Sequence, residues 1–283
     1  MATFPEQAVA AVNAALTPVA DAVLAPLVSR APLSTLSVVS ALTALAMLAV
    51  VRRTSNQAAL AAAKRGIRAA LFEVRLFHDE PRGVWAAVGR MLRSNAAYLR
   101  HTIVPFLWMA LPLTLVVAQL QAWYGYEGLR PATAVLLRAE LHASRLAAAE
   151  RMTLVAPEGI DAEAAPVRLR GGRELVWRVT PERAGRYTVT LRDDDSGTDT
   201  AITLDATAGF ARRSPVRGTS WDDLLLYPSD PPLPASHAAR RVSLAYPEPG
   251  LAVAGTRVPW LVAYVLVSMA LAFALARRIG VVL

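Results

Sequence analysis

The stretch that decides the fold is Leu33–Val51, LSTLSVVSALTALAMLAVV, which has no charged residue and is followed at once by Arg52 and Arg53. A helix of about 20 apolar residues crosses the ~30 Å hydrocarbon core of a bilayer. Two more stretches have this character, Thr102–Leu120, TIVPFLWMALPLTLVVAQL, and Pro259–Ala276, PWLVAYVLVSMALAFALA. We therefore predict an α-helical membrane protein with three transmembrane helices, at residues 33–51, 102–121 and 259–276.

The composition agrees with a chain that lies partly in lipid. Hydrophobic residues make up 54% of the sequence and charged residues 18%, below the roughly 25% charged residues of soluble domains. The mean hydropathy is +0.36. The chain contains no cysteine, which excludes disulfides, thiolate metal sites and cysteine nucleophiles.

The net charge of +8 is concentrated in one loop. Residues 52–101 hold ten Lys or Arg against three Asp or Glu, a net charge of +7, whereas residues 122–258 hold 17 of each and are neutral. Membrane proteins keep basic loops in the cytoplasm. We therefore expect a bacterial inner-membrane protein with residues 52–101 and the tail 277–283 in the cytoplasm, and with the N-terminus and residues 122–258 outside. Because the charge flanks apolar segments, DNA is not expected as a partner.

Residues 52–101 have the pattern of a helical hairpin. Two apolar stripes at helical spacing occur, at Leu60, Ile67, Leu71 and Val74 and at Val84, Val88, Met91, Leu92 and Leu99. The polar segment His78–Gly83 between them contains Pro81 and Gly83, which favour a turn. We predict two antiparallel helices that form a basic cytoplasmic arm.

Residues 1–32 form a separate segment before the first predicted span. Pro5, Pro18 and Pro26 interrupt its apolar runs, and a basic start is lacking, so we do not expect a cleavable signal peptide. The helical spacing of its apolar residues favours two short amphipathic helices on the outer membrane surface. A poorly ordered tail is an equally good interpretation.

Residues 122–258 change to a β-rich pattern. Seven short runs, from Ala134–Leu141 to Val242–Tyr246, are separated by turn residues such as Gly171 and Gly172. This number and spacing predict an inserted antiparallel β-sandwich. Ala184–Tyr187 is similar to the tyrosine corner of immunoglobulin-like sandwiches, and Trp177 is a candidate core residue.

No residue pattern indicates catalysis, a cofactor or a metal. The four histidines lie on different predicted elements without a partner at metal-ligand spacing. Asp193–Asp195 with Asp199 lacks the ligand pattern and final Glu of a calcium loop, so a solvated hairpin turn is the better interpretation. Phosphate-binding loops and nucleophile elbows are not found in the sequence. We predict that the protein is not an enzyme.

The first predicted span carries small polar residues at steps of three, namely Ser34, Ser37, Ser40 and Thr43. Close helix packing through small residues is the simpler explanation. The alternative is one wall of a shallow hydrated groove that opens to the cytoplasm. The three predicted spans hold no ionisable residue, which argues against ion-coupled transport.

The order of segments resembles the YidC/Oxa insertase superfamily, especially its three-span members such as the third subunit of the ER membrane complex. It also resembles uncharacterised bacterial membrane proteins of the same layout. The resemblance rests on Arg52–Gln57 after the first span, the arm up to Arg100, and Pro105 and Pro112 in the second span, about 150 of the 283 residues. Two features depart from the family. Arg52 and Arg53 lie at the rim of the groove, whereas many bacterial members place a basic residue inside it. The segment 122–258 stands where the minimal members have a short connection.

The resemblance implies a membrane-protein insertase or chaperone that eases polar segments through lipid without ATP or metal. Clients, the ribosome or anionic lipids would contact Arg52, Arg53, Lys64, Arg65 and Arg68. The groove wall would consist of Ser34, Ser37, Ser40 and Thr43. The two departures favour a second hypothesis, a non-catalytic accessory or scaffolding subunit of a larger envelope complex that docks on other membrane proteins through the β-domain.

Overall fold

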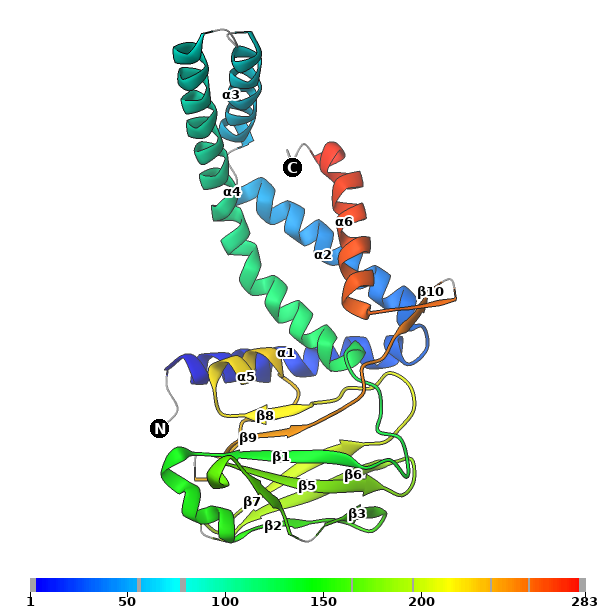
Figure 1. Ribbon diagram of the computed structural model, residues 1–283. Coiled ribbons are helices and arrows are strands. Elements are labelled where there is room, and N and C mark those ends of the chain that lie inside the picture. Colours follow the sequence, from blue (N-terminus) through cyan, green and yellow to red (C-terminus); the bar gives the residue numbers. More distant parts are fainter. Residues whose placement is uncertain are drawn as a thin grey trace. The chain divides into compact units, whose positions relative to one another are not determined.

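The computed structural model describes residues 4–54, 57–76, 80–163, 165–194, 196–234, 236–253 and 255–279 (Figure 1). The chain divides into two compact units. Unit 1 comprises Met1–Thr35 and Leu115–Trp260, and unit 2 comprises Leu36–Thr114 and Leu261–Leu283.

Among the described residues, three helices are long and apolar enough to cross a membrane, namely α1 (Phe4–Val28), α2 (Pro32–Thr54) and α4 (Pro81–Tyr124). A shorter apolar run, Trp260–Ala276, lies in α6 (Trp260–Ile279). The stretches predicted to span therefore fall in α2, α4 and α6, and α1 is an additional candidate that the sequence analysis did not select.

The N-terminal segment is one continuous helix of 25 residues. The expectation of two short helices is wrong for the described part. Pro18 and Pro26 lie inside α1, and both are exposed. A helix tolerates an interior proline better there, because the carbonyl group that loses its N–H partner is not sealed in a core.

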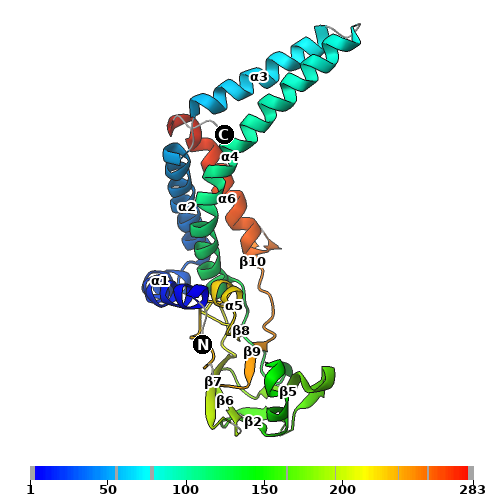
Figure 2. The same ribbon diagram turned by 90° about the vertical axis from the view of Figure 1, so that its left-hand side faces the viewer.

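In unit 2, α3 (Gln57–Leu76) runs beside the first half of α4 (Figure 2). Glu73 accepts a hydrogen bond of 2.8 Å from Arg90 Nε, and Lys64 lies over the ring of Tyr98. A Cβ added to Gly66 would lie 2.6 Å from Ser94 Oγ. As the residue numbers of these contacts rise on α3, the numbers of their partners on α4 fall, so the two helices are antiparallel. The predicted turn at His78–Gly83 lies partly outside the described residues. We call α3 and residues 81–100 of α4 the arm.

The seam of the arm is built from small side chains. Leu60, Ala63, Ala70 and Ala87 are buried there, whereas Leu71 and Leu92 of the predicted stripes are more than half exposed. Alanine favours helix formation, and its small side chain allows the two helices to approach closely. The predicted helices are present, and most residues of the predicted stripes are buried or half-buried, whereas Leu71, Leu92 and Leu99 are exposed.

The β-region of unit 1 has two main antiparallel sheets and a hairpin (Figure 1). The first sheet has the order β3-β5-β1-β9-β8, with β4 also paired to β5; the second has the order β2-β6-β7, and β10 pairs β11. The strands are β1 (Val135–Leu141), β2 (Met152–Val155), β3 (Ile160–Ala162), β4 (Val167–Leu169), β5 (Glu174–Pro181), β6 (Arg186–Asp193), β7 (Thr198–Asp205), β8 (Val216–Gly218), β9 (Ala239–Leu244), β10 (Leu251–Val253) and β11 (Thr256–Val258). Three short helices accompany them, η1 (Ala143–Glu150), η2 (Arg170–Gly172) and α5 (Trp221–Leu226).

Side chains from both main sheets share one hydrophobic core. Alternate residues of β1 and β6 are buried, as expected for strands with one face on a core. The prediction for Trp177 is confirmed, since its side chain is fully buried. The Tyr187 hydroxyl donates a hydrogen bond of 3.0 Å to the carbonyl of Arg183.

Candidate functional site

The five basic residues predicted to contact partners lie on α2 and α3. Arg52 and Arg53 occupy the last turn of α2, and both are exposed. Arg65 and Arg68 are exposed on α3. Lys64 differs, because it is half-buried with its Nζ 5.7 Å from the centre of the Tyr98 ring. At that distance a cation–π contact stabilises the pairing of α3 and α4.

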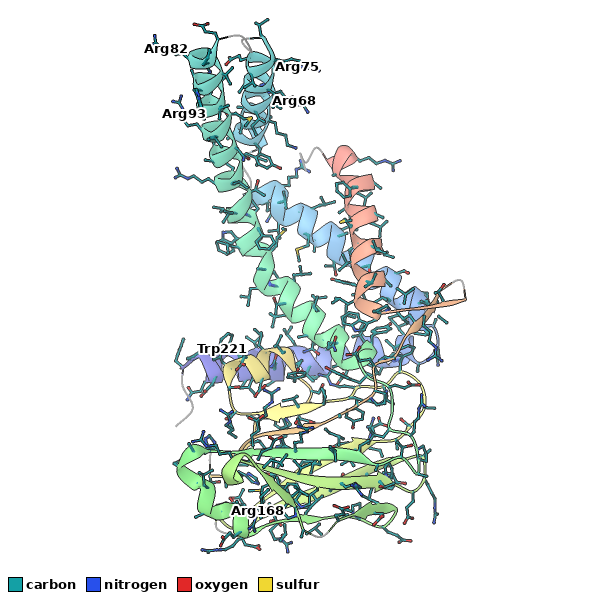
Figure 3. The ribbon with its side chains drawn as sticks, in the orientation of Figure 1. Arg68, Arg75, Arg82, Arg93, Arg168 and Trp221 are labelled. Atoms are coloured by element: carbon teal, nitrogen blue, oxygen red, sulfur yellow. The ribbon has the colours of Figure 1, made fainter. Side chains whose placement is uncertain are left out.

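The outer surface of the arm combines arginine with large apolar side chains. Phe72, Leu76 and Trp85 are 70%, 73% and 75% exposed. Arg68 and Arg75 project from α3, and Arg82 and Arg93 project from α4 (Figure 3). This surface can bind a partner that is both acidic and apolar.

The structure separates the four small polar residues of the predicted groove wall. Ser34 and Ser37 are exposed, whereas Ser40 and Thr43 are buried. The Ser268 hydroxyl of α6 lies 3.4 Å from the carbonyl oxygen of Ser40, and the Thr43 side chain lies beside Tyr264 of α6. Two of the four therefore pack between helices of unit 2, and they do not share one surface with the others.

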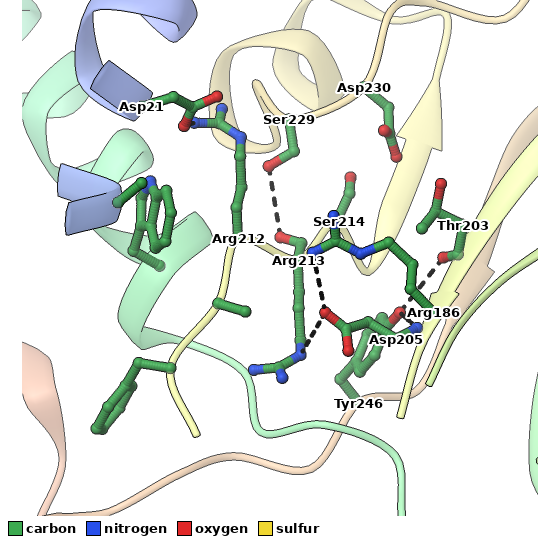
Figure 4. Close-up of a pocket in the computed structure, with 14 residues that line it drawn as sticks. Asp21, Arg186, Thr203, Asp205, Arg212, Arg213, Ser214, Ser229, Asp230 and Tyr246 are labelled. Atoms are coloured by element: carbon green, nitrogen blue, oxygen red, sulfur yellow. Dashed lines mark hydrogen bonds and ion pairs between the residues drawn. The ribbon is translucent and has the colours of Figure 1, made fainter. Parts of the chain in front are cut away.

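A polar cluster in unit 1 was not found by sequence reasoning. Asp205, at the end of β7, is 2% exposed. Its carboxylate accepts hydrogen bonds from Thr207, 2.8 Å from the backbone nitrogen, and forms ion pairs with Arg213 at 3.5 Å and Arg186 at 3.3 Å. We call these four residues, together with Tyr246, the Asp205 cluster; Figure 4 shows all of them except Thr207.

Arg213 ties the β-region to the end of α4. Its guanidinium donates to the carbonyls of Tyr126, Gly209 and Thr207 at 2.7–2.9 Å, and its side chain is fully buried. The backbone N–H of Arg213 also donates to the carbonyl of Ala122 in the last turn of α4. One arginine thus joins the end of α4 to the loop after β7.

The neighbouring Arg212 points to α1. Its guanidinium forms an ion pair with Asp21 of α1 and lies 3.2 Å from Gln119 Oε1 of α4. Asn13 and Thr17 donate hydrogen bonds from α1 to the carbonyls of Leu224 and Pro228. α1 therefore lies against α5 and the loop that follows it.

Burial and pairing control the ionisation of this region. Burial alone would raise the pKa of Asp205, but hydrogen bonds from Thr207 and the charges of Arg213 and Arg186 outweigh it and hold the pKa below its usual value. Burial raises the pKa of Tyr246 to about 12, so its hydroxyl stays neutral. Burial also raises the pKa of Asp230 in the same cavity, with Arg217 acting in the opposite direction.

The cavity beside the cluster has a volume of about 400 Å³. Three arginines and three aspartates line it, namely Arg186, Arg212, Arg213, Asp21, Asp205 and Asp230. With balanced charge and with ion pairs on Asp21 and Asp205, the arrangement acts as a structural joint between α1, α4 and the β-region. Among the described residues, no group of three or more His, Asp or Glu could hold a metal ion.

Tyr124 connects the ends of the apolar helices within unit 1. Its buried ring stacks on Trp260, the first residue of α6, with ring centres 6.3 Å apart, and lies 5.4 Å from Phe210 of the β-region. Its hydroxyl donates 2.8 Å to the carbonyl of Pro32, the first residue of α2. The start of α2, the end of α4 and the start of α6 therefore meet beside the β-region.

The adjacent arginines at positions 212 and 213 could have indicated the joint from the sequence. Two neighbouring cations in a region without net charge need acidic or polar partners when folding buries them.

Comparison of the chain with protein-family models, with curated proteins and with solved structures gives no match.

Proposed function

We propose that this chain is a membrane-protein insertase or membrane chaperone that works through its basic arm. The observation that carries the proposal is the exposed surface of α3, where Arg65, Arg68 and Arg75 accompany Phe72 and Leu76. The arginines would bind acidic client segments, ribosomal RNA or lipid phosphates. The apolar side chains would cover the hydrophobic part of a client.

The continuity of α4 supports the proposal. Residues 81–114 of α4 lie in unit 2 and extend over about 50 Å at 1.5 Å per residue. Residues 81–100 belong to the arm, and Phe106, Leu107 and Trp108 further along are 61–67% exposed. A client bound by the arm would pass along one helix to side chains suited to lipid.

The proposed client path follows the exposed side of α2, where Ser34 and Ser37 lie. Ser40 and Thr43 contribute to packing with α6 instead, so the polar part of the path is short. We propose that the arm and the C-terminal tail lie in the cytoplasm of a bacterial cell and the β-region outside its inner membrane, which the charge bias supports.

Depletion of the protein, followed by quantitative proteomics of the membrane fraction, tests the proposal. We expect a set of membrane proteins to fall in amount, and a photo-crosslinker at Phe72 to capture members of that set. An unchanged membrane proteome without crosslinked clients would refute the proposal.

Charge-reversal variants distinguish an effect of the arm's arginines from an effect of surface charge elsewhere on the protein. The double variant Arg65→Glu, Arg68→Glu should fail to restore the depleted proteins. The control Arg168→Glu, Arg183→Glu changes two exposed arginines of the β-region by the same charge and should restore them. Equal rescue by both variants would count against the arm as the client site.

A second candidate function, an accessory or scaffolding subunit of an envelope complex, is favoured by the form of the β-region. We propose that this region is an immunoglobulin-like sandwich, a fold that many cell-surface proteins share. The order β2-β6-β7, with Tyr187 at the start of β6, corresponds to strands C, F and G. The order β3-β5-β1-β9 corresponds to D, E, B and A, with the late strand β9 in the place of the first.

Gentle extraction with size analysis distinguishes the two functions. A permanent subunit would co-purify with a stoichiometric partner that is lost when the exposed surface of the β-region is altered. A chaperone would be isolated without such a partner, with clients in small and varying amounts.

A further inference from the structure

The exposed surface of α1 is entirely apolar over most of its length. Every exposed residue from position 8 to position 27 is Ala, Val, Leu or Pro. Val12, Leu16, Val19, Val23 and Leu27 repeat at helical spacing and are 37–61% exposed. Such a surface is unfavourable in water and suits lipid.

The opposite side of α1 carries a polar row at steps of four, formed by Asn13, Thr17 and Asp21. Each of these side chains binds the β-region, through Leu224, Pro228 and Arg212 respectively. The row extends over about 12 Å of the helix at 1.5 Å per residue. α1 is therefore held along its middle by a polar, charged domain.

We infer that α1 does not cross the bilayer, although its length and hydropathy would permit it. The geometry points to α1 lying parallel to the membrane plane, on the side that holds the β-region, with its apolar surface in the lipid interface. A crossing α1 would draw the carbonyls of Leu224 and Pro228 and the ion pair of Arg212 with Asp21 into hydrocarbon, where polar and charged groups are strongly disfavoured.

Lipid is the occupant of this surface because α1 leads directly into α2. Only residues 29–31 separate Val28 from Pro32, and the Tyr124 hydroxyl holds the Pro32 carbonyl beside the β-region. The end of α1 is thus within three residues of an apolar helix that is long enough to span. Since the exposed surface lacks arginine and lysine, apolar burial rather than head-group charge drives the contact. This inference is independent of what the arm binds.

Nitroxide depth measurements on the full-length protein in nanodiscs test the inference. The chain has no cysteine, so single variants Val12→Cys, Val19→Cys and Leu27→Cys can each carry one label. We expect all three labels at one shallow depth below the head groups, unchanged when zwitterionic lipid is replaced by anionic lipid. As controls, Leu42→Cys on α2 should report a deeper position, and the exposed Thr153→Cys on β2 should report water.

Two results would overturn the inference. Positions 12 and 27 are about 22 Å apart along the helix, so labels whose depth changes steeply between them would show that α1 crosses the bilayer. If oxygen dissolved in the lipid collided with none of the three nitroxide labels, water or another protein would cover the apolar surface of α1.

Discussion

At the scale of single residues, Arg213 is a buried charge whose partners all come from unit 1. Its side chain is fully buried, its partner Asp205 is 2% exposed, and it donates to three carbonyls. Removing one member of a buried ion pair typically costs 3–5 kcal/mol, because the remaining charge stays buried. We predict that Arg213→Met lowers the free energy of unfolding by about 3 kcal/mol, since Asp205 retains Arg186 and Thr207.

Chemical unfolding in mild detergent, followed by the circular dichroism of the β-region, measures this loss. The exposed Arg168→Met is the matched control, and a surface substitution of this kind should change stability by less than about 0.5 kcal/mol. Equal effects of the two variants would show that the joint contributes little to stability.

His237 makes the stability of the β-region depend on pH. The side chain is fully buried, and its Nδ1 accepts a hydrogen bond of 3.0 Å from the N–H of Ala239. Burial lowers the pKa of His237, although Asp193 acts in the opposite direction. The unfolded chain therefore takes up the proton first, so stability is fully present above about pH 6.5 and falls as the pH drops below it.

We predict that His237→Asn, which keeps an acceptor for Ala239, flattens the fall in unfolding free energy between about pH 6.5 and 5. Each unmatched proton contributes at most about 1.4 kcal/mol per pH unit. His142→Asn is the control. Burial, and then Arg145 and Arg240, also lower the pKa of His142, but this side chain is only half-buried. A slope that both variants leave unchanged would assign the pH dependence to the carboxylates.

At the scale of elements, the arm depends on the close approach of its two helices. A Cβ at Gly66 would lie 2.6 Å from Ser94 Oγ, whereas a Cβ at Gly89 would meet nothing within 4 Å. We predict that Gly66→Leu destabilises the arm by about 1–3 kcal/mol through overpacking. Gly89→Ala should stabilise it by up to about 1 kcal/mol, because alanine favours the helix.

Hydrogen exchange of the α3 amides measures both effects. Exchange should become faster in Gly66→Leu and slower or unchanged in Gly89→Ala. Faster exchange in both variants would mean that α3 and α4 do not pack through the contacts described for Glu73, Lys64 and Gly66.

At the scale of the whole molecule, the charge bias predicts on which side of the membrane each part of the chain lies. Single-cysteine variants Arg82→Cys in the arm and Arg168→Cys in the β-region alter exposed positions (Figure 3). In intact cells with the outer envelope permeabilised, an impermeant thiol reagent should label position 168 and spare position 82, because the basic arm stays inside. The opposite pattern would reverse the topology and remove the basis of the insertase proposal.

Some features of the fold follow from local patterns in the sequence, and the continuity of α1 does not. The runs in α2, α4 and α6, the strand alternation and the burial of Trp177 were predictable, because each depends on a local pattern of apolar residues. The continuity of α1 was not predictable, since Pro18 and Pro26 normally end helices and only their position on an exposed side makes them tolerable.

By itself, the sequence determined which segments are apolar, where the basic charge gathers and which segment forms strands, because hydropathy and charge act over neighbouring residues. Only the tertiary structure decided that Ser40 and Thr43 pack against α6, and that Asp21 belongs to a joint with Arg212. These pairings join residues 191 or more positions apart. No local pattern encodes such a contact, because its free energy arises only when folding has buried both partners.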